Sequence, residues 1–304
     1  MIQEVDSPKR TELIDAVKCF GKRGCDWTAP VVEHSCDGRG YGEPVTSRSA
    51  VQFLSERIVR LDSESLIGAA PWQHAVAVMS SYTNTTPTQE IDELIIDPKE
   101  ADDAAAHSVL LQRLSAEATG LVRGPIDRKR QIWMTTGRNA IETRTPSRRC
   151  LVEPRVTNSI VASYSTGGLF TSTAVMAGRS MWQMYLEPYE GSEMFPGPWA
   201  AWSMPVAASA VVAEIDSAEA WARFVQRYPR LVNGHIYPDW RSAAEDYDGV
   251  HLALAAVVAG QGWFLRSADG VATIAASYWD TECTFWFRWS FDEPALCQAD
   301  VLAN

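Results

Sequence analysis

The sequence has few histidines and cysteines, and no long apolar run. Its 304 residues include five histidines and six cysteines. Cysteines this sparse do not build the disulfide framework of a small secreted domain. No apolar stretch approaches the roughly 20 residues that a helix needs to cross a bilayer. The first residues also lack the basic start and apolar run of a signal peptide. We therefore expect a cytoplasmic protein without a membrane partner.

The sequence also lacks the short motifs of several large enzyme classes. It contains no GxxxxGK[ST] phosphate loop and no GxGxxG dinucleotide fingerprint. The zinc-protease pattern HExxH and the hydrolase pattern GxSxG are absent as well. If the chain is an enzyme, we expect its site to use carboxylates, hydroxyls and arginines.

One group of residues near the N-terminus contains metal-ligand types. Cys19, Cys25, His34 and Cys36 fall within 18 residues. A structural zinc site takes four such ligands, usually as two closely spaced pairs. Five residues separate Cys19 from Cys25, which is wider than the usual spacing of two to four. We therefore expect reduced thiols and no metal here.

The overall charge is acidic, with one basic exception. The net charge is −11, and hydrophobic residues make up 46% of the chain, which is enough for a sizeable core. Such a chain is not broadly attracted to nucleic-acid backbones. Residues 123–149 nevertheless hold eight basic residues against Asp127 and Glu142. This segment is either a solvated linker or, if its charges gather on one face, an anion site.

Apolar periodicity predicts a mainly helical region over residues 1–145, which ends in the basic connecting segment. Helices are expected at 7–21, 47–61 and 97–120, and a strand at 74–82. The third helix has the clearest signals, because Asp97 is a suitable N-cap, Pro98 suits the first turn and Gly120 suits the end. A change in composition near residue 145 indicates the boundary between two domains.

Residues 146–304 predict an aromatic-rich α+β domain. We expect a mixed, mostly antiparallel sheet with flanking helices. The expected strands are 157–164, 168–175, 181–188, 199–206 and 209–216, followed by a strand, a turn and a last strand within 270–291. The expected helices are 217–229, capped by Asp216 or Ser217, and a long one over 239–262, capped by Asp239.

Alternation in the last strand predicts two faces. Cys283, Phe285, Phe287 and Trp289 should lie on one side, and Glu282, Thr284 and Trp286 on the other. His251 falls in the apolar half of the long expected helix, where we expect a packed core histidine. A carboxylate–imidazole pair with Asp246 or Asp248 is the alternative.

Three short patches in the second half carry a family resemblance. In chain order they are the arginines Arg149 and Arg155, the hydroxyl run Thr171–Thr173, and Glu282. This order resembles the arginine, Ser-Thr-Ser and glutamate arrangement of ADP-ribosyltransferases. The middle patch here reads Thr-Ser-Thr, and Asp280 stands where the family usually has a glutamate or glutamine.

The resemblance implies that NAD is the substrate and that each patch has a separate role. An arginine would hold the diphosphate, since a guanidinium matches phosphate oxygens bidentately. Arg155 and Arg149 compete for this role, and Arg144 is a third candidate. Thr171, Ser172 and Thr173 would shape the nicotinamide pocket, with Tyr164, Phe170 or a tryptophan stacked on the ring. Glu282 would be the catalytic acid, which stabilises the positive charge that grows as nicotinamide leaves.

Other interpretations of the same residues remain open at this stage. Thr171–Thr173 also suit a solvent-facing strand, Arg155 a surface position, and Glu282 a strand end paired with Arg288. The function we expect is ADP-ribosyl transfer, or NAD glycohydrolysis, with a protein or nucleic-acid acceptor. The alternative is a non-enzymatic adaptor or inhibitor that binds a partner through its acidic surface. A nucleic-acid binder that uses residues 123–149 is a third reading.

Overall fold

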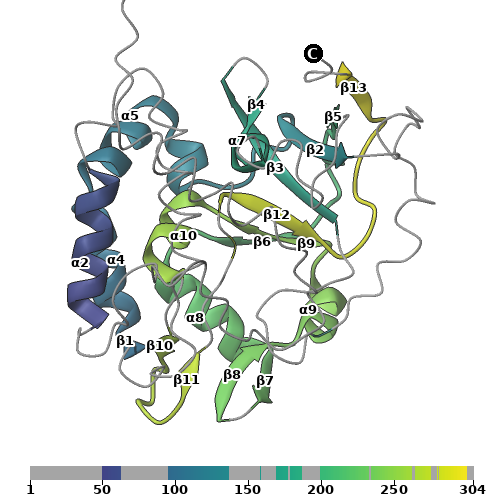
Figure 1. Cartoon of the computed structure of the whole chain (residues 1–304). Helices are drawn as coiled ribbons and strands as arrows, with labels where there is room; N and C mark the ends of the chain where they lie inside the picture. Colours follow the sequence, from purple (N-terminus) through teal and green to yellow (C-terminus); the bar gives the residue numbers. More distant parts are fainter. Residues whose placement is uncertain are drawn as a thin grey trace, which may run out of the picture.

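A computed structural model shows an α+β protein with two sheets and a layer of helices (Figure 1). It describes residues 50–62, 95–136, 158, 169–176, 179–186, 199–232, 234–261, 264–274, 279 and 281–299. The sheets are mixed and mostly antiparallel, as the sequence predicted.

The larger sheet places strands from distant parts of the chain side by side. Its order is β13 (Ala295–Ala299), β5 (Trp199–Ser203), β2 (Gln131–Thr136), β3 (Leu169–Met176), β12 (Cys283–Trp286), β9 (Gly249–Leu252) and β6 (Val212–Ile215), with β4 (Arg179–Ser180) beside β3. β6 and β9 run parallel, and the other neighbours run antiparallel. The strand that carries Thr171–Thr173 is therefore a direct neighbour of the strand that follows Glu282.

The smaller sheet lies at the bottom of Figure 1, below the helices. Its order is β1 (Ile95–Ile96), β10 (Phe264–Arg266), β11 (Thr273–Ile274), β8 (His235–Pro238) and β7 (Pro229–Val232). The hairpin between β7 and β8 turns at Gly234, whose φ of 85° suits a residue without a side chain.

Helices gather on one side of the larger sheet (Figure 1). They are α2 (Ala50–Leu61), α4 (Pro98–Ala106), α5 (Val109–Arg123), α8 (Ala218–Arg227) and α10 (Leu254–Gly260). Their apolar residues share one buried cluster with β6, β9 and β12, and this cluster includes Trp221, Val257 and Phe285. A second cluster on the opposite face contains Leu169, Trp202 and Trp286.

Side-chain caps confirm three of the expected helix starts. Asp97 accepts from the N–H groups of Lys99 and Glu100 at the start of α4. Ser217 accepts from Ala220 N at the start of α8, and Asp239 accepts from Arg241 N and Ser242 N at the start of α9 (Trp240–Asp246). Each cap satisfies backbone donors that a first helical turn leaves unpaired.

The helix expected over 97–120 is two helices, and its expected end is wrong. α4 stops at Ala106, and Ser108 caps α5 by accepting from Leu111 N. Asp62 reinforces this break, because its carboxylate accepts from Val109 N and Leu110 N. Gly120 lies inside α5, which continues to Arg123. The Ser108 hydroxyl therefore replaces a backbone carbonyl as the hydrogen-bond acceptor, and a new helix begins there.

The strand expected over 181–188 is helix α7 (Met181–Leu186). Methionine, glutamine and leucine are good helix formers. Ser180 Oγ also accepts from Gln183 N at 3.2 Å, the spacing of a helix-capping serine. The aromatic residues of the segment suggested a strand, but the cap and the propensities favoured a helix.

The long helix expected over 239–262 is also wrong. The segment forms α9, then the central strand β9, then α10. Pairing with β6 and β12 makes the middle part a strand, and Gly249 permits it, because a Cβ there would lie 2.9 Å from Phe285 O and 2.9 Å from the Trp286 ring. The close approach of β12 thus needs a glycine, and His251 lies on a strand rather than on a helix.

The expected boundary near residue 145 lies outside the described residues. Strand β2, which precedes it, pairs with β3 and β5, which follow it. Helices α4 and α5 pack against α10, and all three contribute to one buried cluster. The described residues on the two sides of the boundary therefore share a sheet and a core.

Candidate functional site

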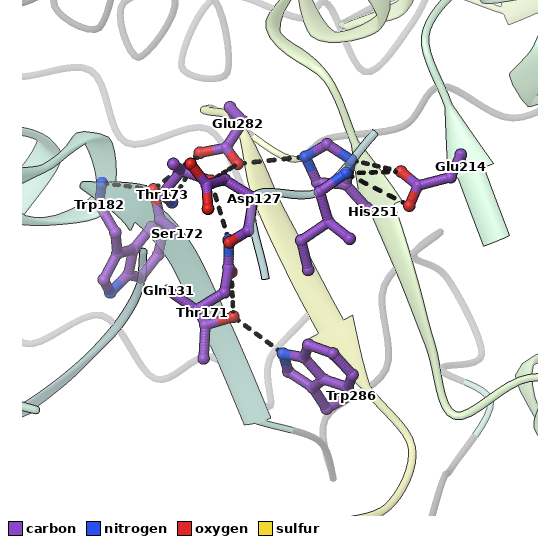
Figure 2. Close-up of polar contacts among 11 residues, drawn as sticks. Asp127, Gln131, Thr171, Ser172, Thr173, Trp182, Glu214, His251, Glu282 and Trp286 are labelled. Atoms are coloured by element: carbon purple, nitrogen blue, oxygen red, sulfur yellow. Dashed lines mark hydrogen bonds and ion pairs between the residues drawn. The ribbon is translucent and has the colours of Figure 1, made fainter. Parts of the chain in front are cut away.

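Glu282 contacts strand β3, called here the hydroxyl strand because it carries Thr171, Ser172 and Thr173, in the interior of the protein (Figure 2). Ser172 Oγ donates to Glu282 Oε2 at 3.0 Å, and Thr173 Oγ1 donates to Glu282 Oε1 at 2.7 Å. The backbone N–H of Thr173 also donates to Oε2, at 3.0 Å. Residues 109 to 110 positions apart in the sequence thus surround one carboxylate. Glu282 itself has no exposed surface.

A histidine and a second glutamate continue the network. His251 Nε2 lies 3.1 Å from Glu282 Oε1, and His251 Nδ1 lies 2.8 Å from Glu214 Oε2. Pairing of β9 with β6 sets Glu214 opposite His251. Glu214 also accepts from the backbone N–H of Ile126. Its side chain is 34% exposed, whereas that of His251 is 1% exposed, so the network runs from the surface to the buried acid.

The two carboxylates raise the pKa of His251. Burial alone would lower it, because a charged imidazolium loses its hydration. Hydrogen bonds to Glu214 and Glu282, together with their negative charges, outweigh burial and raise the pKa to about 9. At neutral pH, His251 is therefore an imidazolium that donates one hydrogen bond to each carboxylate.

Amide and indole groups extend the network along β3. Gln131 donates to Thr173 Oγ1 at 2.8 Å and accepts from Thr171 Oγ1 at 2.6 Å. Trp286 Nε1 donates to Thr171 Oγ1 at 2.8 Å. On the side of α7, Trp182 N donates to Ser172 Oγ at 3.3 Å. Both threonine hydroxyls thus donate and accept, so the network fixes their orientation.

Two further hydroxyls next to Glu282 have no partner. Thr281 Oγ1 and Thr284 Oγ1 are buried and make no hydrogen bond. Thr284 pairs across the sheet with His251 on one side and Thr171 on the other, which places it on the polar face. A buried hydroxyl without a partner is costly. These two groups therefore keep unused hydrogen-bonding capacity inside the protein.

An aromatic pair lies beside the hydroxyl strand. Trp182 stacks on Tyr185, with ring centroids 5.0 Å apart and ring planes 14° apart. Trp182 is half-buried. Phe170, one of the rings expected to stack on nicotinamide, instead packs in the core against Trp279 and Phe285. Trp182 is thus an aromatic residue next to Ser172, which its backbone N–H contacts.

The expected site residues have different outcomes. Thr171, Ser172, Thr173 and Glu282 come together, and all four are buried, so the solvent-facing strand reading is wrong. Arg149, Arg155 and Tyr164 lie outside the described residues, as do Arg144 and the possible metal ligands Cys19, Cys25, His34 and Cys36. Within the described part of the chain, no cluster of three or more His, Cys, Asp or Glu suits a metal.

The ion pairs expected around these groups are different from those observed. Arg288 pairs with Asp248 at 3.2 Å and not with Glu282. Asp246 binds Arg227 and Tyr228 and leaves His251 to the two glutamates. The alternative for His251, a carboxylate–imidazole pair, therefore forms with Glu214 on β6 and with Glu282 before β12, not with its sequence neighbours Asp246 and Asp248.

Sequence reasoning missed Glu214 and the role of His251. Glu214 is the single charged residue within the apolar run 210–215, which is an unusual position in a strand next to a core. That charge was the available signal. The contact between His251 and Glu214 was not expected, because a helix over 239–262 would place His251 outside the sheet.

Searches against protein-family models, curated proteins and solved structures found no match to this chain. Among the described helices, none is both long and apolar enough to cross a membrane.

Proposed function

We propose that this protein cleaves the bond between nicotinamide and ribose in NAD, and transfers ADP-ribose to an acceptor or to water. The observation that carries the proposal is that Ser172 and Thr173 both donate hydrogen bonds to the carboxylate of Glu282. The sequence suggested these three as parts of one site, although they are distant in the chain.

The chemistry of the network suits the nicotinamide half of the substrate. As nicotinamide leaves, positive charge develops on the ribose, and a fixed negative group stabilises it. Two carboxylates and one imidazolium leave the network with one net negative charge. The unpaired hydroxyls of Thr281 and Thr284 suit ribose hydroxyls, and the Trp182 ring suits a flat aromatic group. With water as acceptor, the products are ADP-ribose, nicotinamide and one proton.

Among the described cations, Arg130 is suitably placed for the diphosphate. Its NH2 group donates to the carbonyl of Ala174, the residue after Thr173. Its side chain is 53% exposed and is only loosely paired with Asp127, at 3.9 Å. Arg128, by contrast, is occupied by the carbonyls of Ala207 and Ala210. Arg130 therefore joins Arg149 and Arg155 as a candidate for the diphosphate.

Burial of Glu282 sets a condition on the reaction. Because the carboxylate has no exposed surface, NAD reaches it only after the covering groups move. The backbone N–H of Trp182 and the indole of Trp286 both donate to hydroxyls of this strand, so a movement of the strand would change the surroundings of both residues. The proposal therefore requires that NAD change the tryptophan fluorescence of the protein.

The test is nicotinamide release from NAD, followed by chromatography, for the wild type and for Glu282→Gln. We expect a roughly 10²- to 10³-fold lower rate in the variant, the usual effect of losing one electrostatic contact in a transition state. Glu219→Gln, a change on the exposed face of α8, is the matched control and should keep the wild-type rate. No release by the wild type, with water, protein or nucleic acid as acceptor, would refute the proposal.

A second candidate function is non-enzymatic partner binding through the acidic surface. The observation that favours it is the saturation of Glu282, whose oxygens are already engaged by Ser172, Thr173 and His251. In that case the network only stabilises the fold. Glu282→Gln would then lower the unfolding free energy, and the wild type would neither bind NAD nor release nicotinamide.

A further inference from the structure

The row formed by Glu214, His251 and Glu282 connects the protein surface to the buried acid (Figure 2). Each of the three comes from a different part of the larger sheet: β6, β9 and the residue before β12. Register fixes the link between Glu214 and His251, which lie opposite each other on β6 and β9. On its other side His251 lies opposite Thr284, two residues after Glu282. Strand pairing therefore sets the position of His251 relative to Glu214, and a side-chain contact joins His251 to Glu282.

His251 is the group that compensates Glu282. A fully buried carboxylate is costly unless it is paired and hydrogen-bonded. Two hydroxyl donors and one backbone N–H contact Glu282, but none of them carries charge. His251 is its ion-pair partner. Without that cation, the buried carboxylate would have hydrogen-bond donors but no charged partner.

Glu214 in turn keeps His251 charged. Its carboxylate accepts from Nδ1 at 2.8 Å, which also fixes the orientation of the ring and directs Nε2 at Glu282. Glu214 is partly exposed and is anchored by Ile126 N, so it retains contact with water. The titratable groups that face His251 are Glu214 from β6 and Glu282 before β12, while β3 presents the uncharged Thr173 next to Glu282.

We infer that His251 is a positioning residue, and that Glu214 acts through it from the surface to keep Glu282 paired with a cation and directed at Ser172 and Thr173. This inference rests on the proposed function for its catalytic consequence. Neither residue touches substrate in this account. Glu214 supplies the net negative charge of the network, and His251 transmits its effect to the acid.

The structure predicts a specific pH dependence for this device. Deprotonation of His251 would place two carboxylates next to a neutral ring, so Glu282 would lose its cation. Because the pKa of His251 is raised to about 9, activity should hold through neutral pH and fall as the pH rises through about 9. In Glu214→Gln, His251 has lost one of its two anions, so the fall should occur at lower pH.

Two measurements on the full chain test the inference. The first is nicotinamide release against pH for the wild type, Glu214→Gln and the control Glu219→Gln. In Glu214→Gln only, we expect the alkaline fall in activity to occur at a proton concentration at least tenfold higher than in the wild type. An unchanged profile in Glu214→Gln, from a protein that does release nicotinamide, would overturn the inference and leave the proposed function intact.

The second measurement is an NMR titration of the His251 ring, assigned by its disappearance in His251→Gln. We expect titration well above the ordinary value of 6.5 in the wild type, and at clearly lower pH in Glu214→Gln. Titration near 6.5 in the wild type, or no change in Glu214→Gln, would overturn the inference. If the wild type releases no nicotinamide, the proposed function fails, and this titration still decides whether Glu214 controls the charge of His251.

Discussion

At the scale of the residue, the main feature is a charged group held inside the core by neutral and charged partners together. Glu282 is fully buried, and its oxygens accept from Ser172, Thr173 and His251. Removing one partner of a buried ion pair leaves the other without compensation, which is strongly destabilising. The network therefore matters for stability as well as for the proposed chemistry.

Thr173→Val should destabilise the protein. The variant loses the hydrogen bond to Glu282 Oε1 and the one accepted from Gln131, while the shape of the side chain is kept. Hydrogen bonds to charged groups contribute about 1.5–3 kcal/mol each. We expect a loss of that order in the free energy of unfolding, measured with urea. Thr119→Val, on the exposed face of α5, should change it by less than about 0.5 kcal/mol.

Stability should also decrease at alkaline pH. The folded-state pKa of His251, about 9, is above its ordinary value of 6.5, so the folded protein binds this proton more tightly than the unfolded chain. The resulting stabilisation is complete below pH 6.5 and is lost as the pH rises through about 9. Urea midpoints from pH 6 to 10 would measure it. A midpoint that stays constant over that range would contradict the ion pair.

At the scale of the element, helix caps could be predicted from the sequence, but the strand that separates α9 from α10 could not. Asp97, Ser217 and Asp239 each cap a helix at the expected position, because a cap depends on residues that are adjacent in sequence. The strand β9 was not predictable in the same way. Its residues continue an apolar run that suits a helix, and only pairing with β6 and β12 makes them a strand.

Gly249→Ala should test the reason given for β9. The added Cβ would lie 2.9 Å from Phe285 O, so either β9 or β12 must shift. We expect a loss of about 1–3 kcal/mol in unfolding free energy, as in other overpacked cores. Gly120→Ala is the matched control, because no atom lies within 4 Å of its added Cβ and the helix favours alanine. That variant should be as stable as the wild type or more stable.

The same contrast explains how much of the site could be predicted. The hydroxyl run and Glu282 are visible as a pattern in the sequence, and the structure brings them together. His251 and Glu214 join them only through strand register, which depends on contacts between residues 37 positions apart. Long-range register of this kind leaves little trace in local periodicity.

At the scale of the whole molecule, the sheet and the helix layer join segments from both sides of residue 145. β2 pairs with β3 and β5, and α4 and α5 bury their apolar faces against α10. The α+β class could be predicted, because both helical and strand-like patterns occur in the sequence. The position of β2 within the sheet could not be predicted, since the residues that pair with it follow by 40 positions or more.

A fragment of residues 146–304 should therefore not fold as the intact chain does. It lacks β2, which lies between β3 and β5, and it exposes the apolar surface of α10 that α4 and α5 cover. We expect no cooperative urea transition from this fragment, monitored by circular dichroism and tryptophan fluorescence. A sharp transition like that of the full chain would show that the region beyond residue 145 folds independently.

The most direct test of the account as a whole is calorimetric titration of the full chain with NAD. In the proposed function, Glu282 and the hydroxyls of β3 form part of a binding site for this dinucleotide. We predict saturable binding of one NAD per chain, weakened at least tenfold in Thr173→Val and unaffected in Thr119→Val. Absence of binding to the folded wild type, or equal binding by both variants, would contradict the claim.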